Sequence, residues 1–228
     1  MILLEATEVQ IQFSDIGITH LRVIFSHLRR MLSAAISRSG GTHLSDIIKY
    51  MWFGFLPADS PERIAKEKEA AEDLGDARIM PLRMFLGMAW ELFVSGLYPK
   101  MRWQAGEVYL DGVAGSPDGF SIAAVPPAII ENTLQIEEFK LTWKSFRNRE
   151  ILKETLWMWQ LAGYCKMAGT RFARLHVCWV NGDYSHGENW GPRYFRYLIE
   201  FKQHEIDRLW KDMFLNNKEK AIGPNTGS

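Results

Sequence analysis

The sequence has few cysteines and no excess of charge of either sign. Only Cys165 and Cys178 occur, without a Cys-x-x-Cys pair. They cannot form a four-thiolate zinc or iron–sulfur site within one chain, and we expect two buried free thiols rather than a disulfide framework. Lysine plus arginine equals aspartate plus glutamate at 27 each. This balance argues against a protein that coats nucleic acid through bulk charge, but it leaves room for a local basic site.

Long apolar runs are also missing. The most apolar stretch, residues 84–97, is interrupted by Glu91 and is shorter than the roughly 20 residues that span a bilayer. The first five residues do not begin a basic segment followed by a long apolar one, so no signal peptide is predicted. We therefore expect a cytoplasmic protein, in the host cytoplasm if the chain is viral, without a membrane partner. Walker A and Gly-x-Ser-x-Gly motifs do not occur either, which argues against P-loop and serine-hydrolase chemistry.

Apolar periodicity and turn residues divide the chain into an N-terminal part and an α/β core. Helices are predicted over 17–37, 44–55, 82–97, 149–168 and 203–216, and a polar one begins near Asp59. Strands are predicted over 107–113, 119–125, 134–142, 171–180 and 194–201. We expect a mainly helical N-terminal extension over 1–80, a central mixed sheet flanked by helices over 81–216, and a flexible tail over 217–228.

The strand over 134–142 carries a candidate catalytic pair. Because side chains alternate along a strand, Leu134, Ile136, Glu138 and Lys140 share one face. A carboxylate and an ammonium two residues apart can hold a metal ion and a water molecule side by side. The alternative is an ion pair at the end of a strand.

Two further acids come from other elements. Asp118 projects from a tight Ser-Pro-Asp-Gly turn, which on its own is more typical of a plain hairpin. Glu91 is the only acid in the apolar helix over 82–97. A buried carboxylate there is costly unless it is paired or binds a cation, so the alternative for Glu91 is a buried salt bridge.

The helix over 149–168 presents a polar stripe. Gln160 and Tyr164 lie four residues apart and face the same way, with Lys153 seven residues before Gln160 on the same stripe. An amide, a phenol and an ammonium in a row suit phosphate oxygens, although such a stripe can also be an ordinary solvated face.

The order of these signals resembles the PD-(D/E)XK nuclease superfamily. The shared pattern is an acid on a helix, Pro-Asp at a strand turn, Glu-x-Lys on the next strand and Gln-x-x-x-Tyr on the next helix. The pair Gln160 and Tyr164 makes the chain similar to the RecB-like branch, which includes the phage λ exonuclease-like enzymes. The resemblance covers residues 82–180 and implies a restriction-endonuclease-like core.

The resemblance also implies roles for the candidate residues. Asp118, Glu138 and the carbonyl of Phe139 would bind Mg²⁺ or Mn²⁺, and Glu91 would complete the acidic cluster. Lys140 would orient or deprotonate the attacking water. Gln160 and Tyr164 would position the DNA strand.

Two departures from the family pattern matter. Many RecB-like members carry a histidine near the helix acid, and none occurs in 82–97, so the metal shell would be one ligand short. Five of the six histidines, His43 and His176 among them, are scattered and show no ligand spacing. Members with an iron–sulfur cluster carry four cysteines, which this chain does not have. Glu137 competes with Glu138, but its side chain is expected on the opposite face.

A basic segment follows the candidate strand. Residues 139–153 carry a local charge of +4 and interleave Trp143 and Phe146 with the cations. This composition suits a track for the DNA backbone and for stacked bases, and a solvated linker is the alternative. The predicted DNA-binding residues are Lys144, Arg147, Arg149 and Lys153.

The leading hypothesis is a Mg²⁺- or Mn²⁺-dependent deoxyribonuclease, an exonuclease in DNA recombination, repair or phage DNA processing. Its partners would be DNA and either further copies of the chain or a recombination protein. Two alternatives stay open, namely a structure-specific or site endonuclease and a weakened nuclease fold that binds DNA or protein.

Overall fold

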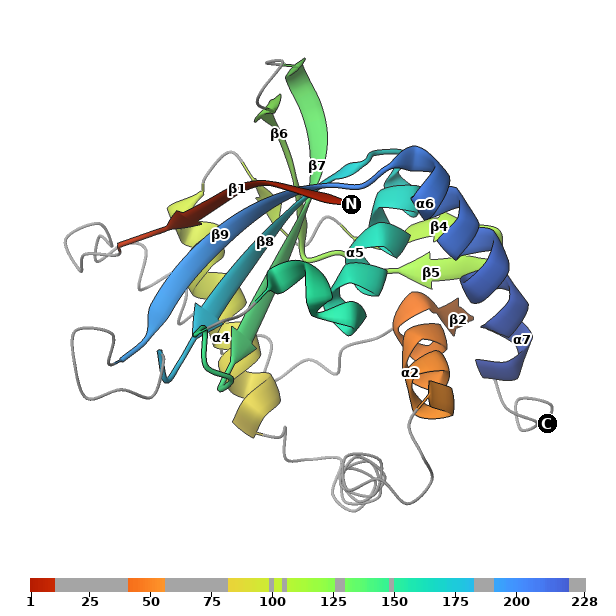
Figure 1. The fold of residues 1–228 in the computed structure, drawn as a ribbon, viewed down its shortest axis with the longest axis horizontal. Coiled ribbons are helices and arrows are strands. Elements are labelled where there is room, and N and C mark those ends of the chain that lie inside the picture. Colours follow the sequence, from red (N-terminus) through yellow and green to blue (C-terminus); the bar gives the residue numbers. More distant parts are fainter. Residues whose placement is uncertain are drawn as a thin grey trace.

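A computed structural model describes residues 1–10, 41–55, 82–98, 101–103, 106–125, 130–147, 150–182 and 191–221. The helices predicted over 17–37 and from Asp59 lie outside these ranges. Within them the chain forms a mixed α/β fold, which confirms the predicted central mixed sheet flanked by helices (Figure 1).

Nine strands and several helices make up the described fold. The strands are β1 (Ile2–Glu8), β2 (Thr42–His43), β3 (Arg102–Trp103), β4 (Val108–Leu110), β5 (Val113–Gly115), β6 (Gly119–Val125), β7 (Ile130–Thr142), β8 (Phe172–Trp179) and β9 (Arg193–Glu200). The helices are α2 (Leu44–Phe55), α4 (Leu82–Leu97), α5 (Thr155–Ala168), α6 (Gln203–Arg208) and α7 (Asn216–Ala221), with a 3₁₀ turn over Ile151–Lys153 and a π-helix over Leu209–Leu215.

The main sheet has the strand order β1-β9-β8-β7-β6-β3. Its central strands β7 and β8 pair in parallel, and the other described neighbours pair antiparallel. The side chains of β8 are almost all buried, as expected for a central strand covered on both faces. A small second sheet has the order β2-β5-β4.

Helices cover both faces of the main sheet (Figure 1). On one face α5 packs on β7 and β8, and α2 and the C-terminal helices pack around α5. These elements share one core with Ile136, Leu175 and Ile199 of the sheet. On the other face α4 packs through Val94 and Trp90 against β7 and β9. Within the described ranges, no helix has the length and apolarity needed to cross a bilayer.

The strand predicted over 107–113 is wrong in one respect, because the chain reverses within it. Asp111 and Gly112 both have positive φ, at 51° and 71°, and Leu110 pairs with Val113 across the turn. This is the two-residue Asp-Gly hairpin that matches strand twist. Residues 107–113 therefore belong to a β4–β5 hairpin and not to one strand, and β6 pairs with β7.

Two helix boundaries also differ from the predictions. The helix predicted over 149–168 begins only at Thr155, after the 3₁₀ turn that contains Lys153, and it ends as predicted at Gly169 with φ 68°. The helix predicted over 203–216 is divided into α6, the π-helix and α7. Residues 217–221, assigned to the flexible tail, complete α7.

The N-terminal strand corrects the prediction of a mainly helical N-terminal extension at its first residues. β1 is the edge strand of the main sheet and pairs antiparallel with β9. The helix predicted over 44–55 is confirmed as α2, which packs on α5. Where the domain boundary lies stays a prediction.

Two helix glycines are expected to respond oppositely to substitution by alanine. A Cβ at Gly163 would lie 2.4 Å from Leu44 Cδ2 and 3.1 Å from Phe214 Cε2, both in the core. Overpacking a core costs ~1–3 kcal/mol, and the higher helix propensity of alanine offsets up to ~1 kcal/mol of this.

Gly163→Ala should therefore lower the unfolding free energy by about 1–2 kcal/mol in denaturant titrations. At Gly87 no described atom lies within 4 Å, so the control Gly87→Ala should be neutral or stabilising. Stabilisation by Gly163→Ala would contradict the packing argument.

Candidate active site

The predicted catalytic and metal-binding residues meet at one cavity of about 360 Å³. The predicted residues come from four elements: α4, the turn before β6, β7 and α5. The predicted residues that line the cavity are Glu91, Asp118, Glu138, Phe139, Lys140, Gln160 and Tyr164. We call this cavity the acidic pocket.

Strand alternation on β7 directs the central pair into the acidic pocket. Ile136 lies in the core beneath α5, and Glu138 and Lys140 follow on the same face at two-residue spacing. Glu137 points to the opposite face, where its carboxylate contacts His176 on β8. The expectation that Glu138 rather than Glu137 faces the pocket is thus confirmed.

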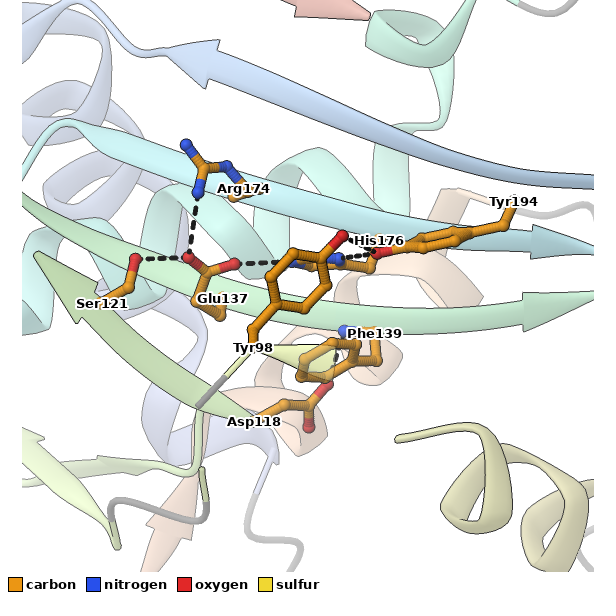
Figure 2. Close-up of polar contacts among 8 residues, drawn as sticks. All are labelled: Tyr98, Asp118, Ser121, Glu137, Phe139, Arg174, His176 and Tyr194. Atoms are coloured by element: carbon orange, nitrogen blue, oxygen red, sulfur yellow. Dashed lines mark hydrogen bonds and ion pairs between the residues drawn. The ribbon is translucent and has the colours of Figure 1, made fainter. Parts of the chain in front are cut away.

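Hydrogen bonds link the polar side chains of the pocket into a chain. Lys140 Nζ donates to Glu138 Oε1 at 2.5 Å and to Gln160 Oε1 at 2.9 Å. Gln160 Nε2 in turn donates to the Tyr164 hydroxyl at 3.0 Å. Asp118 Oδ2 accepts the backbone N–H of Phe139 at 2.7 Å (Figure 2). The last contact ties the Asp118 turn to β7 beside Glu138.

The pocket is electrostatically crowded. Burial and the charges of Glu138 and Glu91 raise the pKa of Asp118 well above its usual value, against the opposing effects of Lys140 and the Phe139 N–H. Burial by itself lowers the pKa of Lys140, but the neighbouring carboxylates outweigh it, so the pKa of Lys140 is raised. The ammonium is therefore held in its charged form, whereas the carboxylates repel one another.

The carboxylate oxygens suit a hard divalent cation. Glu138 Oε2 is buried and has no hydrogen-bond partner among the described residues. A buried oxygen left in this way is costly, and Mg²⁺ or Mn²⁺ prefers such ligands. Within the described ranges no three acidic, histidine or cysteine side chains lie close enough to hold one ion together. Glu91 therefore shares the pocket with Asp118 and Glu138 without forming a three-carboxylate cluster.

The pocket also contains residues that the sequence did not single out. His43 and Ser45 line it where β2 leads into α2. His43 is buried, and its Nε2 lies 3.8 Å from Glu107 Oε1. An imidazole is thus present in the pocket although α4 carries none. It arrives through the pairing of β2 with β5, some 70 residues away, and this long-range contact leaves no local pattern in the sequence.

The predicted DNA-binding cations are only partly grouped. Lys144 forms an ion pair with Glu154 at 2.7 Å and lies over the Trp157 ring. Lys153 pairs with Glu150 at 2.8 Å and lies in the 3₁₀ turn, so the prediction that it continues the stripe of Gln160 and Tyr164 is wrong. Arg147 is exposed, and Arg149 lies outside the described residues. None of the three described cations lines the acidic pocket.

The raised pKa of Asp118 predicts a stability effect. An acid whose pKa is higher in the folded chain destabilises the fold once the pH exceeds its unfolded value, since the charged form is disfavoured on folding. Asp118→Asn removes this charge and keeps an acceptor for the Phe139 N–H. We expect the unfolding free energy at pH 7 in EDTA to rise by about 0.5–2 kcal/mol, and the gain to vanish as the pH falls through the unfolded pKa of Asp118. A loss of stability at pH 7 would contradict the crowding described above.

Comparisons with known proteins give similarity at the level of solved structures. No protein-family model matches the chain, and no curated protein matches it significantly. One similar structure is the alkaline exonuclease LHK-Exo from Laribacter hongkongensis, solved in complex with dAMP, at 17% identity, TM-score 0.46, and 80% coverage of this chain and 90% of that one. A phage-related exonuclease from Haemophilus somnus has 11% identity, TM-score 0.45, and coverage of 79% and 93%. The protein SSO0001 has 16% identity, TM-score 0.43, and coverage of 88% and 87%. At these scores the likeness assigns neither a family nor a function to this chain.

Proposed function

We propose that this chain is a divalent-metal-dependent DNA nuclease of the PD-(D/E)XK type. The observation that carries the proposal is the convergence of Asp118, Glu138 and Lys140 in one pocket, where one buried oxygen of Glu138 has no hydrogen-bond partner among the described residues. Two separate elements, the turn before β6 and the strand β7, bring these groups together, and an isolated surface ion pair needs no such arrangement.

Asp118, Glu138 and the Phe139 carbonyl would hold Mg²⁺ or Mn²⁺. When bound, the ion lowers the pKa of a coordinated water and stabilises charge on the scissile phosphate and the leaving oxygen. Glu91 would act on the same site through its charge, since it lies in the pocket without joining a cluster. A cation would also relieve the repulsion that raises the pKa of Asp118.

Lys140 would orient the attacking water and offset the negative charge that develops on the phosphate. Its ammonium is fixed between Glu138 and Gln160, and its raised pKa favours a hydrogen-bond donor over a general base. Gln160 and Tyr164, which are hydrogen-bonded to each other, would position the strand that carries the scissile phosphate.

Within this class we propose an exonuclease in DNA recombination, repair or phage DNA processing, as the resemblance to RecB-like enzymes implies. The endonuclease and the non-catalytic binding module are the other outcomes of the test that follows.

The test compares the wild type with Lys140→Ala on end-labelled linear DNA and closed circular DNA, with Mg²⁺, Mn²⁺ or EDTA. We expect metal-dependent loss of linear DNA, reduced about 100- to 1,000-fold by Lys140→Ala. The matched control is Lys166→Ala, which removes a lysine of α5 that pairs with Asp207 and should leave the rate unchanged. Nicking of circles would indicate the endonuclease. DNA binding without turnover in any metal would reject both enzymes.

The basic segment predicts a salt-dependent contribution to DNA binding. Arg147 is exposed beyond the end of β7, and a single phosphate contact there would change the slope of log Kd against log salt by about 1. Arg147→Ala should weaken binding of catalytically inactive protein similarly for all sequences. Lys202→Ala removes one cation at the opposite end of the sheet, beyond β9, and should leave the slope unchanged. Equal slopes for wild type and Arg147→Ala would remove the basic segment from the DNA interface.

A further inference from the structure

A second group of polar side chains lies buried or half-buried on the face of the main sheet opposite the acidic pocket, and the proposed mechanism does not use it. It comprises Ser121 on β6, Glu137 on β7, Arg174 and His176 on β8, Tyr194 on β9 and Tyr98 after α4 (Figure 2). We call it the Glu137 network. Glu137 and His176 are 2% and 1% exposed.

The network connects four strands to the end of α4. Glu137 Oε2 lies 2.6 Å from His176 Nε2, and His176 Nδ1 lies 2.6 Å from the Tyr194 hydroxyl. The Tyr194 hydroxyl is hydrogen-bonded to that of Tyr98 at 3.1 Å. The other oxygen of Glu137 accepts the Ser121 hydroxyl and lies 3.7 Å from the Arg174 guanidinium.

The protonation states are mutually consistent. Burial lowers the pKa of His176, so the imidazole is neutral near pH 7 and offers one donor and one acceptor. A carboxylate only accepts, so Nε2–H donates to Glu137 and Nδ1 accepts the Tyr194 O–H. The single proton of the Tyr194 hydroxyl is then used on Nδ1, so the Tyr98 hydroxyl is the donor in the contact between the two tyrosines.

A buried polar network is in general weak evidence for a contribution to stability. Replacing buried ionic or polar pairs with apolar side chains of similar volume is often neutral or stabilising. A polar pair, by contrast, is satisfied only in one arrangement. What Glu137 and His176 provide is therefore specificity of arrangement.

The arrangement that they fix is that of the acidic pocket. Glu137 precedes Glu138, so a slip of β7 by one residue would exchange the two carboxylates between the faces of the sheet. The His176 ring packs on Phe139 at 4.7 Å between centroids, and the Phe139 N–H binds Asp118. Tyr98 follows directly after α4, which carries Glu91. The network thus contacts or adjoins every element that carries a pocket carboxylate.

We propose that the Glu137 network positions the acidic pocket by fixing the register of β7 and the placement of α4. Its members do not touch the reacting atoms. The proposal rests on the metal-dependent function for one readout, metal affinity, and is independent of it for another, the protection of the Phe139 amide.

The test uses the full chain with the double variant Glu137→Met/His176→Phe, which replaces both partners with apolar groups and keeps an aromatic ring on Phe139. We expect it to fold, to bind Mn²⁺ about 10- to 100-fold more weakly in calorimetric titration, and to exchange the Phe139 amide faster by NMR. Glu137→Gln keeps an acceptor for His176 and should restore both values to near those of the wild type.

Two further variants keep the test decisive. Thr170→Val removes a hydrogen bond of 2.6 Å to the Leu134 carbonyl at the other end of β7, and it should lower stability without changing Mn²⁺ affinity or Phe139 exchange. Tyr194→Phe removes one hydroxyl, keeps the ring against Trp90, and replaces the double variant if that does not fold. It should weaken Mn²⁺ binding about three- to 10-fold.

Failure of the positioning role and failure of the metal-dependent function give different results. A folded double variant, or Tyr194→Phe in its place, with wild-type Mn²⁺ affinity and wild-type Phe139 exchange overturns the positioning role. If the wild type itself does not bind Mn²⁺, the metal-dependent function fails, and Phe139 exchange alone then decides the positioning role.

Discussion

The two-residue period of β7 is the constraint on which the site depends. It sends Glu138 and Lys140 into the acidic pocket and Glu137 and Phe139 to the opposite face. β7 is a central strand with a neighbour on each side, and polar side chains lie on both of its faces. On one face Glu138 and Lys140 are charged groups placed to bind a ligand. On the other face the polar groups of the Glu137 network are hydrogen-bonded to one another. A strand at the edge of the sheet would hold neither set of groups as rigidly.

The acidic pocket shows how a fold tolerates groups that repel one another. Asp118 and Glu138 are held close by a backbone hydrogen bond to Phe139 and by the ammonium of Lys140. The raised pKa of Asp118 records the repulsion that remains. Strain of this kind is common where a site is arranged for a ligand and not for the stability of the empty chain.

Local patterns in the sequence were sufficient to predict the elements that carry the acidic pocket. The apolar run with one acid predicted α4, alternation predicted the face of Glu138, and four-residue spacing predicted the pairing of Gln160 with Tyr164. Contacts distant in sequence were not predictable in this way. The strand β1 joins the sheet through β9, and His43 reaches the pocket through β5. The Asp111-Gly112 turn had a local signal, but the apolar residues around it read as one strand. His176 looked isolated because its partners Glu137 and Tyr194 lie on neighbouring strands.

The same Asp-Gly turn is held by the last described segment of the chain. Trp210 Nε1 donates to the Asp111 carboxylate and Lys218 Nζ to its carbonyl, both at 2.8 Å, and the hairpin behind this turn provides the Ala114–Gly115 wall of the pocket. β1 likewise can pair only after β9 has been synthesised, because its ion pair between Glu8 and Arg193 joins residues 185 positions apart. During synthesis, a chain that ends before Trp210 already contains all the candidate catalytic side chains but not the brace for that wall. The contacts that brace this wall therefore become available only after residues 210 to 218 have been synthesised.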